Sequence, residues 1–233
     1  MESHNLSKHL ENQFEKNQNF FWLNVRFEIV AKLIQKWECK NVLDVGAGSG
    51  ALRNKLFKNI DYFFLEPDHK SREELIKKVG KDYEYDKNSE IKFDCISILD
   101  VVEHVDNPKK FIKSYLDQLN PGGKIIISVP AYNFLWSNWD VVLGHKERFT
   151  KKSLKNILPK RNVKLVELTY LFPELVLPAY VRKLINSKNE NFPEINKYLN
   201  SFFFYLSKLI SKLRKITPFG LSVFCIIEKN LNS

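Results

Sequence analysis

The chain has 233 residues, 44% of them hydrophobic, which is enough to build one α/β domain around a filled core. Its formal net charge of +10 favours an anionic partner, be it an acidic metabolite, a phosphorylated lipid, a membrane surface or nucleic acid. The polar start carries no apolar signal-peptide core, and no run of about 20 apolar residues occurs, so we expect neither a signal peptide nor a membrane span.

The first predicted element is a helix from Phe20 to Trp37. Apolar residues recur there at helical spacing, so this helix should cover the sheet or a cleft beside it. The polar residues 1–19 lack such periodicity and are expected to form a loosely docked lead-in. We expect residues 1–38 to form an N-terminal helical cap on a single domain that spans residues 1–233.

A buried strand follows and runs into a glycine-rich turn. Residues 42–45 suit a strand covered on both faces, and Gly46, Gly48 and Gly50 let the backbone turn sharply and approach a ligand closely. A helix that opens at Ala51 should point its free N–H groups toward that ligand. The stretch therefore predicts a site for a nucleotide-type cofactor.

Two cofactor classes use such a turn. The spacing Gly46-x-Gly48-x-x-Ala51 satisfies the dinucleotide fingerprint, with Glu66 as ribose ligand, and would suit an NAD-dependent oxidoreductase. However, Asp44 lies two residues before the first glycine and would repel the pyrophosphate of a dinucleotide. S-adenosylmethionine carries a cationic amine and a sulfonium, which a carboxylate attracts, so Asp44 favours this cofactor.

Strands and helices alternate along the rest of the chain. The further predicted strands are residues 62–65, 83–85, 93–99, 124–129, 163–171 and 221–227. Helices are predicted at residues 71–79 and from the N-cap Asn107 to Leu119, where residues 120–123 stop the helix. The alternation predicts an α/β fold: a doubly wound, mostly parallel, Rossmann-like sheet of seven strands with helices on both faces. A helical insertion is expected at residues 172–218, before the last strand.

Candidate site residues follow the ends of two strands, one of them a cofactor residue and the others catalytic. Asp100 follows the strand at 93–99, at the edge where ligands bind to such sheets. The loop from Pro130 to Arg148 has no periodicity but is rich in aromatic and titratable residues, which is typical of a functional loop. Within it, His145 could deprotonate an acceptor that Arg148 orients, with His104 as an alternative base or a structural residue. An amine or an already ionised acceptor would need no base.

Residues 42–50 resemble motif I of the class I, seven-strand S-adenosylmethionine-dependent methyltransferases. Further matches from about Phe21 to Glu228 include residues 64–66, 93–94, 99–105, 120–123 and 129–132. Residues 135–137 and 144–150 resemble a bacterial subgroup related to the ubiquinone-pathway O-methyltransferases, and Phe21, Trp22 and Arg26 resemble a subgroup signature at the cleft mouth. The resemblance implies that S-adenosylmethionine is bound by Asp44, Gly46, Ala47, Gly48, Gly50, Glu66, Pro67, Asp86, Asp100 and Val101.

These features predict an S-adenosylmethionine-dependent methyltransferase that acts at oxygen on a small-molecule or lipid- or glycan-linked acceptor. The alternatives are an NAD-dependent oxidoreductase and a non-catalytic S-adenosylmethionine-binding protein. Neither Asn-Pro-Pro-Tyr nor Asp-Pro-Pro-Tyr follows the strand at 93–99, which argues against methylation of exocyclic amino groups in nucleic acid, and no nucleic-acid partner is expected. Cys39, Cys95 and Cys225 have no metal-ligand spacing, so no metal is expected, and their odd number suits reduced thiols in a cytoplasm.

Residues 195–216 carry an apolar stripe with spacings of three and four. Lys208, Lys212 and Lys215 lie on another face, and no Asp or Glu occurs between Glu194 and Glu228. This pattern predicts a helix that rests on the inner face of an anionic membrane and presents the cleft to a lipid-linked acceptor. The alternative is a helix packed inside the protein or against the second subunit of a homodimer.

Overall fold

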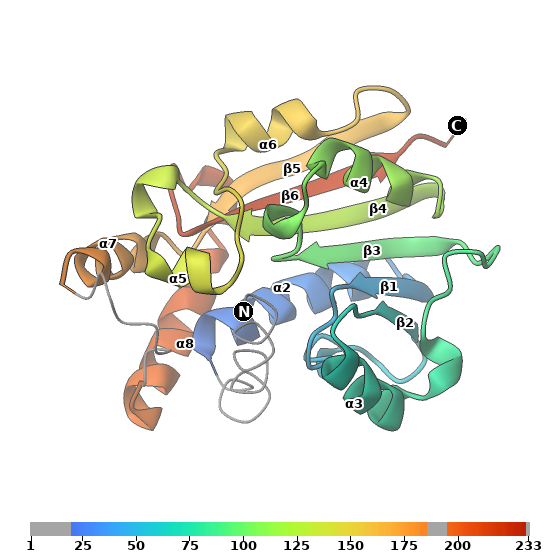
Figure 1. Ribbon diagram of the computed structural model, residues 1–233, viewed down its shortest axis with the longest axis horizontal. Helices are drawn as coiled ribbons and strands as arrows, with labels where there is room; N and C mark the ends of the chain where they lie inside the picture. Colours follow the sequence, from blue (N-terminus) through green and yellow to red (C-terminus); the bar gives the residue numbers. More distant parts are fainter. Residues whose placement is uncertain (1–19, 186–194, 232–233) are drawn as a thin grey trace.

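A six-stranded sheet forms the centre of the molecule, in the order β2-β1-β3-β4-β6-β5 (Figure 1). The computed structural model describes residues 20–185 and 195–231, so the lead-in predicted for residues 1–19 and part of the insertion lie outside the described residues. The strands are β1 (Asn41–Val45), β2 (Asp61–Leu65), β3 (Phe93–Leu99), β4 (Leu119–Pro130), β5 (Val163–Leu171) and β6 (Ser222–Lys229). Strands β1 to β4 are parallel and β6 is antiparallel to both its neighbours, which confirms the Rossmann-like sheet.

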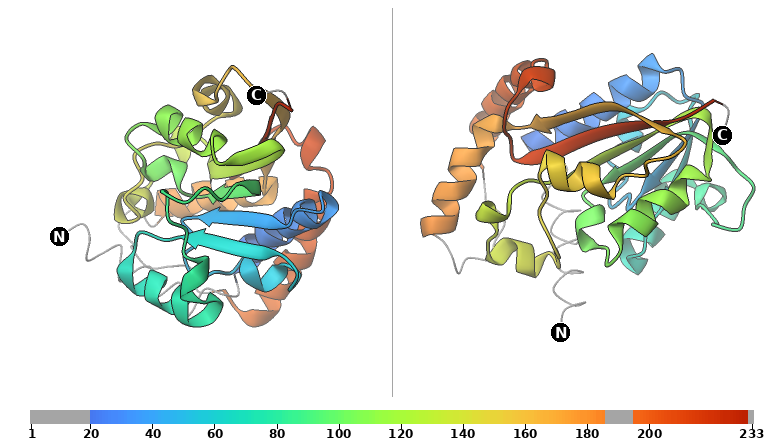
Figure 2. Two further views of the ribbon diagram at one scale, coloured as in Figure 1. Left: turned by 90° about the vertical axis from the view of Figure 1, so that its right-hand side faces the viewer. Right: turned by 90° about the horizontal axis from the view of Figure 1, so that it is seen from above.

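Helices cover both faces of this sheet, with α2 along one face and α4 and α6 along the other (Figure 2). The helices are α2 (Phe21–Lys36), α3 (His69–Val79), α4 (Pro108–Leu116), α5 (Asn138–Val142), α6 (Lys151–Ile157), α7 (Val176–Ile185) and α8 (Lys197–Ser211). The central strand β3 contributes to both apolar layers: Ile96 and Ile98 pack on the α4 side, and Cys95 and Leu99 on the α2 side. This division follows from the two-residue period of a strand.

Several boundaries are those predicted from the sequence. Strands β3 and β5 have the predicted limits. Asn107 caps α4, because its side chain accepts a hydrogen bond of 3.0 Å from the backbone N–H of Lys110, and Pro108 occupies the first turn. All three cysteines are unpaired and buried, as expected.

The strand predicted at residues 83–85 is wrong, so the sheet has six strands instead of seven among the described residues. A 3-10 turn (Lys81–Tyr83) takes its place, and only Glu84 pairs with Phe64, as an isolated parallel bridge. The following residues, 86–92, are polar apart from Ile91 and offer no apolar face that could extend the sheet beyond β2.

Two predicted helix limits are also wrong. No α-helix opens at Ala51; the segment holds only a 3-10 turn (Arg53–Lys55). Residues 51–60 are too few for a helix and its return, since a parallel crossover usually takes a dozen or more residues. Helix α4 ends at Leu116, and residues 120–123 lie within β4, where they are absorbed as an irregularity in the register with β3.

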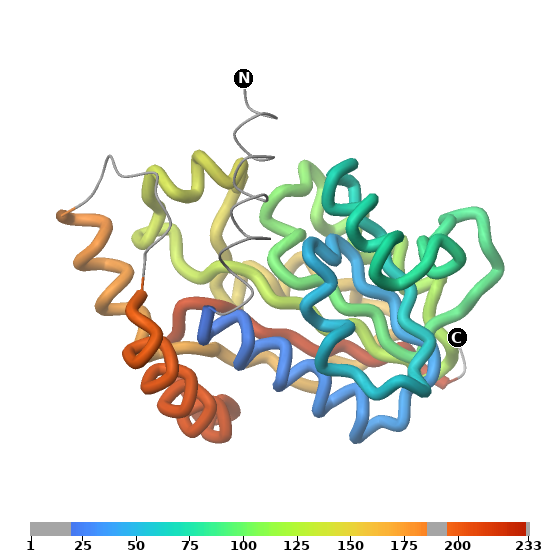
Figure 3. Tube along the Cα trace, turned by 90° about the horizontal axis from the view of Figure 1, so that it is seen from below, coloured from blue at the N-terminus to red at the C-terminus, as the bar shows by residue number. Residues whose placement is uncertain are grey.

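The segment after β4 contains more helix than predicted. The predicted insertion after β5 lies at one end of the molecule. Residues 130–148 are not wholly irregular: they hold a 3-10 helix (Asn133–Leu135) and α5. The insertion supplies α7 and α8, which lie at the end of the molecule toward which β3 and β4 point (Figures 1 and 3). Among the described residues, no helix has the length and apolar composition needed to cross a bilayer.

Candidate active site

The carboxyl ends of β1, β2 and β3 bring most of the predicted cofactor residues to one edge of the sheet. The parallel registers place the glycine turn after β1 beside Glu66 after β2 and Asp100 after β3. The chain continues from β1 to β2 on one side and returns through β3 on the other, so this edge contains the switch point where open α/β sheets bind ligands.

The three glycines of the turn meet different surroundings. All have positive φ, which favours glycine. A Cβ on Gly46 would lie 2.5 Å from Val101 Cγ2, and a Cβ on Gly50 would lie 2.5 Å from Leu75 Cδ2, so both positions are closed by protein atoms. A Cβ on Gly48 would meet no protein atom within 4 Å. The turn is therefore packed at its two ends and open in the middle.

Glu66 holds this turn from the end of β2. Its Oε2 accepts a hydrogen bond of 2.7 Å from Gly48 N, and its Oε1 accepts one of 2.9 Å from Asp68 N. Gly46 N donates to Leu65 O at 2.7 Å, and Ala47 N donates to the same oxygen at 3.4 Å. Burial raises the pKa of Glu66, although these backbone donors oppose the shift. Each carboxylate oxygen keeps a second acceptor position, so the side chain can still bind hydroxyl groups.

Asp44 lies inside the sheet rather than at its surface. Its two oxygens accept hydrogen bonds from Tyr62 Oη at 2.7 Å and from Ser97 Oγ at 2.6 Å. Burial raises the pKa of Asp44 to about 6, against the opposing effect of these two donors. A cationic ligand nearby would favour the ionised form.

An ion pair between a buried arginine and a half-buried aspartate lies between α2 and the end of β3. Arg26 is 4% exposed, and its Nη1 lies 2.5 Å from Asp100 Oδ2. Arg26 Nη1 also donates to Ser128 Oγ at 3.4 Å, whereas its Nε is buried without a hydrogen-bond partner. Asp100 has a φ of 54°, a strained value for a non-glycine residue. The sequence marked Arg26 only as part of a resemblance; no local pattern announces its burial beside Asp100.

The remaining predicted cofactor residues lie at the rim. Asp86 is exposed and accepts hydrogen bonds from Asn88 N at 2.9 Å and from Asn88 Nδ2 at 3.1 Å. Tyr85 N donates to Phe64 O, which places Asp86 beside the end of β2. Pro67 is exposed and connects Glu66 to the N-cap of α3.

On the other side of the edge, His145 and Arg148 meet on one buried carboxylate. Asp140 Oδ1 lies 2.8 Å from His145 Nδ1 and accepts a bond of 2.7 Å from Arg148 Nε, while Oδ2 accepts one of 3.1 Å from Arg148 Nη2. Arg148 Nη1 donates to Ala131 O at 3.1 Å. Burial alone would raise the pKa of Asp140, but the bonds from His145 and Arg148 outweigh it and lower the pKa to about 2.

Asp140 is a candidate site residue to which the sequence analysis assigned no role. A usable signal was present, because Ser137-x-x-Asp140 fits a capping box, and the structure contains that box at the start of α5. The pattern could have placed Asp140 at a helix N-terminus. It could not have shown that His145 and Arg148 return to the same carboxylate.

His104 and His145 are brought together by the structure. Their rings meet edge to face with centroids 4.8 Å apart, and His104 Nδ1 lies 3.2 Å from Gly144 O. Burial, followed by the charge of His145, lowers the pKa of His104. Beneath them Glu103 is fully buried, both its carboxylate oxygens lack a hydrogen-bond partner, and burial raises its pKa well above the ordinary value.

Glu103, His104 and His145 also offer one ligand atom each within 4.8 Å of one another. Imidazole and carboxylate are donors that divalent metal ions accept. Within the described part of the chain, these three side chains are therefore where a metal ion could bind, although the sequence analysis expected none.

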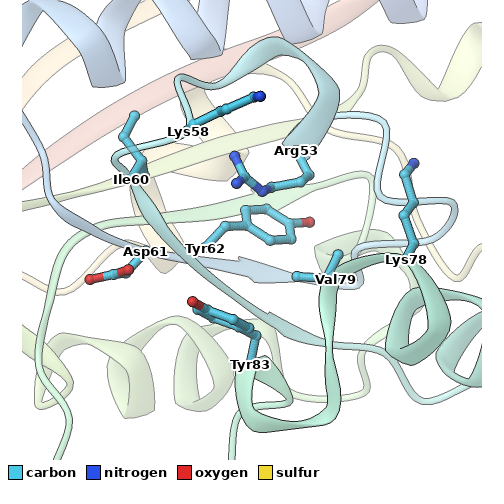
Figure 4. A pocket seen from close by; sticks show the side chains of 8 residues that line it. All are labelled: Arg53, Lys58, Ile60, Asp61, Tyr62, Lys78, Val79 and Tyr83. Carbon is cyan, nitrogen blue, oxygen red and sulfur yellow. The ribbon is translucent and has the colours of Figure 1, made fainter.

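A small pocket lies between the segment before β2 and the end of α3 (Figure 4). It is lined by Arg53, Lys58, Ile60, Asp61, Tyr62, Lys78, Val79 and Tyr83. The pocket adjoins the glycine turn, because Tyr62 Oη donates to Asp44 Oδ2 at 2.7 Å and Lys78 Nζ donates to Ser49 O at 3.2 Å.

Comparison with known proteins gives both a family and a fold. A family model described as a methyltransferase domain matches residues 10–168. A ubiquinone biosynthesis O-methyltransferase of Coxiella burnetii is 31% identical over 106 residues, which cover 41% of this chain and 45% of that protein. A mitochondrial ubiquinone biosynthesis O-methyltransferase of Dictyostelium discoideum is 33% identical over 98 residues, covering 36% of this chain and 30% of that protein. The chain thus matches less than half the length of these relatives.

Two solved structures align with nearly the whole chain. The plantazolicin methyltransferase BamL, in complex with a triazolic desmethylPZN analog and SAH, has a TM-score of 0.62 at 14% identity, covering 98% of this chain and 96% of that chain. The N-methyltransferase NodS from Bradyrhizobium japonicum WM9, in complex with S-adenosyl-l-homocysteine, has a TM-score of 0.55 at 12% identity, covering 97% and 98%. At these identities the likeness shows a shared fold.

Proposed function

The chain belongs to the class I S-adenosylmethionine-dependent methyltransferases related to the enzymes of ubiquinone biosynthesis, and we propose that it transfers a methyl group to a hydroxyl oxygen of a small-molecule or lipid-linked acceptor. Because the chain belongs to this family, the alternative that it is an NAD-dependent oxidoreductase is wrong. The target atom, the acceptor class and the residue roles below are our proposals.

The residues at the sheet edge fit the cofactor. The open space over Gly48 leaves room for a ligand against the backbone, and Glu66 beside it can accept the ribose hydroxyls. Arg26, whose buried Nε has no partner, suits the carboxylate of the methionine moiety, and Asp44 and Asp100 supply negative charge for its amine and sulfonium. Asp86 at the rim would bind the adenine amine.

The observation that supports methylation at an oxygen atom is the contact between His145 and Asp140. Because the pKa of Asp140 is about 2, its carboxylate is ionised at neutral pH, so His145 Nδ1 must carry the proton of the hydrogen bond. In the neutral imidazole Nε2, which lies 4.0 Å from Glu103 Oε1, is then the unprotonated nitrogen and would take the proton of an acceptor hydroxyl. An amine that is already neutral has a free lone pair and would not need such an oriented base.

S-adenosylmethionine would supply a methyl carbon bound to a good sulfur leaving group. The protein's share is to align the acceptor oxygen and to remove its proton, and alignment can contribute up to about 7–11 kcal/mol. Arg148, which the sequence analysis assigned to the acceptor, has its guanidinium occupied by Asp140 and Ala131 O. We therefore assign Arg148 to positioning Asp140, and through it His145.

Transfer of labelled methyl from S-adenosylmethionine into lipid and metabolite extracts tests the proposal. Label in an alkali-stable ether of a hydroxylated acceptor would support it, and label on nitrogen would overturn the oxygen target. Cofactor binding without transfer to any fraction would identify a non-catalytic binding protein. The assay should be repeated with EDTA, because Glu103, His104 and His145 offer metal ligands.

Replacing Glu66 by alanine is expected to raise the dissociation constant for S-adenosylmethionine by the equivalent of about 1.5–3 kcal/mol, since two hydroxyl groups lose a charged acceptor. Calorimetry measures this constant directly. Asp61→Ala, at the opposite end of the same strand and exposed, is the matched control and should bind normally. An unchanged dissociation constant in Glu66→Ala would show that Glu66 does not bind the cofactor.

Cofactor affinity should also depend on pH through Asp44. Because burial raises its pKa to about 6, the carboxylate is protonated below that pH and can no longer attract a cation. We expect affinity for S-adenosylmethionine to be constant above pH 6 and to fall by up to about tenfold per pH unit below it. Asp44→Asn should bind weakly at pH 8 and show a flatter profile. Identical profiles in the two proteins would show that Asp44 does not sense the cofactor.

A further inference from the structure

The side of helix α8 that contacts the protein is mixed: it carries three polar contacts as well as Phe203 and Phe204, the latter packed against the core. Asn200 accepts a hydrogen bond of 3.1 Å from the first residue of α2, and Ser207 donates to Glu174. Lys208 pairs with Glu28 of α2 at 2.8 Å. Of the apolar residues on this side, Phe203 stacks on Phe21 with ring centroids 5.3 Å apart. A helix of a globular protein usually turns its apolar side inward.

The apolar stripe of residues 195–216 consequently faces solvent. Phe202 is 61% exposed, Tyr205 69% and Ile216 77%. The other exposed apolar residues of the segment are Tyr198, Leu199, Leu209 and Leu213. Helix α8 packs on α2, as the alternative expects, but most of the stripe lies outside that contact, so what covers it must come from outside the described residues.

Helix α7 lies at the same end of the molecule as α8 (Figures 1 and 3). Its exposed apolar residues are Leu177, Tyr180, Val181, Leu184 and Ile185. Helix α7 also contacts the acceptor-side loop, because Lys183 Nζ donates to Phe134 O at 2.7 Å and Arg182 lies over the ring of Trp139 at 5.6 Å. We call the exposed apolar residues of α7 and of residues 195–216 the apolar end face.

Among the described residues of α7 and of the 195–216 segment, every charged side chain is basic, and the acids that contact α8, Glu28 and Glu174, come from other elements. Lys197, Lys212 and Lys215 are exposed, and residues 176–185 and 195–227 contain no Asp or Glu. An isologous contact with a second copy of the chain would bring these lysines together, at a cost in repulsion. A surface that combines apolar and anionic groups would satisfy both features.

From this arrangement we infer that the apolar end face is a docking surface for an anionic lipid bilayer, with α7 and α8 lying in the plane of the interface. Their apolar side chains would enter the boundary between headgroups and acyl chains, and the three lysines would lie among anionic headgroups. Because α7 adjoins the loop that carries His145, docking would place the candidate active site beside the bilayer. The inference does not depend on the methyl-transfer reaction, and its test needs neither cofactor nor acceptor.

The test is co-sedimentation of the full chain with vesicles of phosphatidylcholine alone or mixed with phosphatidylglycerol. We expect binding to the mixed vesicles only. A Lys197→Glu, Lys212→Glu, Lys215→Glu variant should bind them at least about tenfold more weakly, since each basic residue near an anionic surface contributes on the order of 1 kcal/mol. A Phe202→Gln, Leu209→Gln variant should lose binding by removing apolar contact. Both variants change exposed residues only, and circular dichroism would verify their folding.

The matched control is Lys109→Glu, Lys110→Glu, Lys113→Glu, which makes the same charge change at exposed positions of α4. It should bind the mixed vesicles far better than the Lys197, Lys212, Lys215 variant. Failure of the native chain to sediment with either vesicle would overturn the inference, as would normal binding by both α8 variants. A dimer in sedimentation velocity that the Phe202→Gln, Leu209→Gln variant dissociates would show instead that the face pairs two copies.

Discussion

His145→Ala is expected to lower kcat of methyl transfer by about 10²- to 10⁴-fold, the range that a positioned general base contributes. The reason is that Asp140 fixes the proton on Nδ1, so that in the neutral ring Nε2, which lies 4.0 Å from Glu103 Oε1, is the nitrogen that takes the hydroxyl proton. The dissociation constant for S-adenosylmethionine should not change, because His145 lies on the acceptor side of the site. Initial rates with the acceptor identified by labelled transfer, and calorimetry for the cofactor, measure the two quantities.

Asp140→Asn distinguishes an oriented base from a histidine that only supports the loop. An amide cannot hold the Nδ1 proton as a carboxylate does, so kcat should fall while the remaining activity moves to higher pH, where an ionised acceptor no longer needs the base. A purely structural role would lower stability without changing the pH profile. An undiminished kcat in His145→Ala would show that His104 is the base or that the reaction needs no base.

The second large effect is expected at Gly48. Gly48→Ala adds a methyl group where the structure has open space, so any loss of cofactor affinity reports a ligand at that place. Overpacking typically costs about 1–3 kcal/mol, which corresponds to a dissociation constant raised by up to about a hundredfold. Calorimetry with S-adenosylmethionine and thermal unfolding should be measured together.

Gly144→Ala is the matched control for this substitution. Gly144 has a φ of 71° against 54° for Gly48, and a Cβ there also meets no protein atom within 4 Å. Both variants should lose similar stability from the positive φ, on the order of 1–3 kcal/mol, but only Gly48→Ala should lose cofactor affinity. Equal affinities in the two variants would show that the cofactor does not approach Gly48.

The sequence by itself determined the parts of this protein that depend on local pattern. A strand apolar on both faces followed by Gly46, Gly48 and Gly50 predicts the turn, because the period of two and the positive φ are properties of the segment alone. The alternation of strands and helices predicted the parallel sheet, and the caps at Asn107 and Pro108 predicted the start of α4. The prediction of a strand at residues 83–85 failed because the local pattern there was weak and because pairing at a sheet edge depends on the neighbouring strand.

The tertiary structure decided which side chains share a site. Arg26 meets Asp100, and His145 meets Asp140 and Arg148, through contacts between separate elements that no local spacing encodes. It also decided the orientation of α8. Periodicity shows that an apolar stripe exists but not which way it faces; the polar contacts of Asn200, Ser207 and Lys208 turn that stripe to solvent, because they hold the opposite side of the helix against the protein.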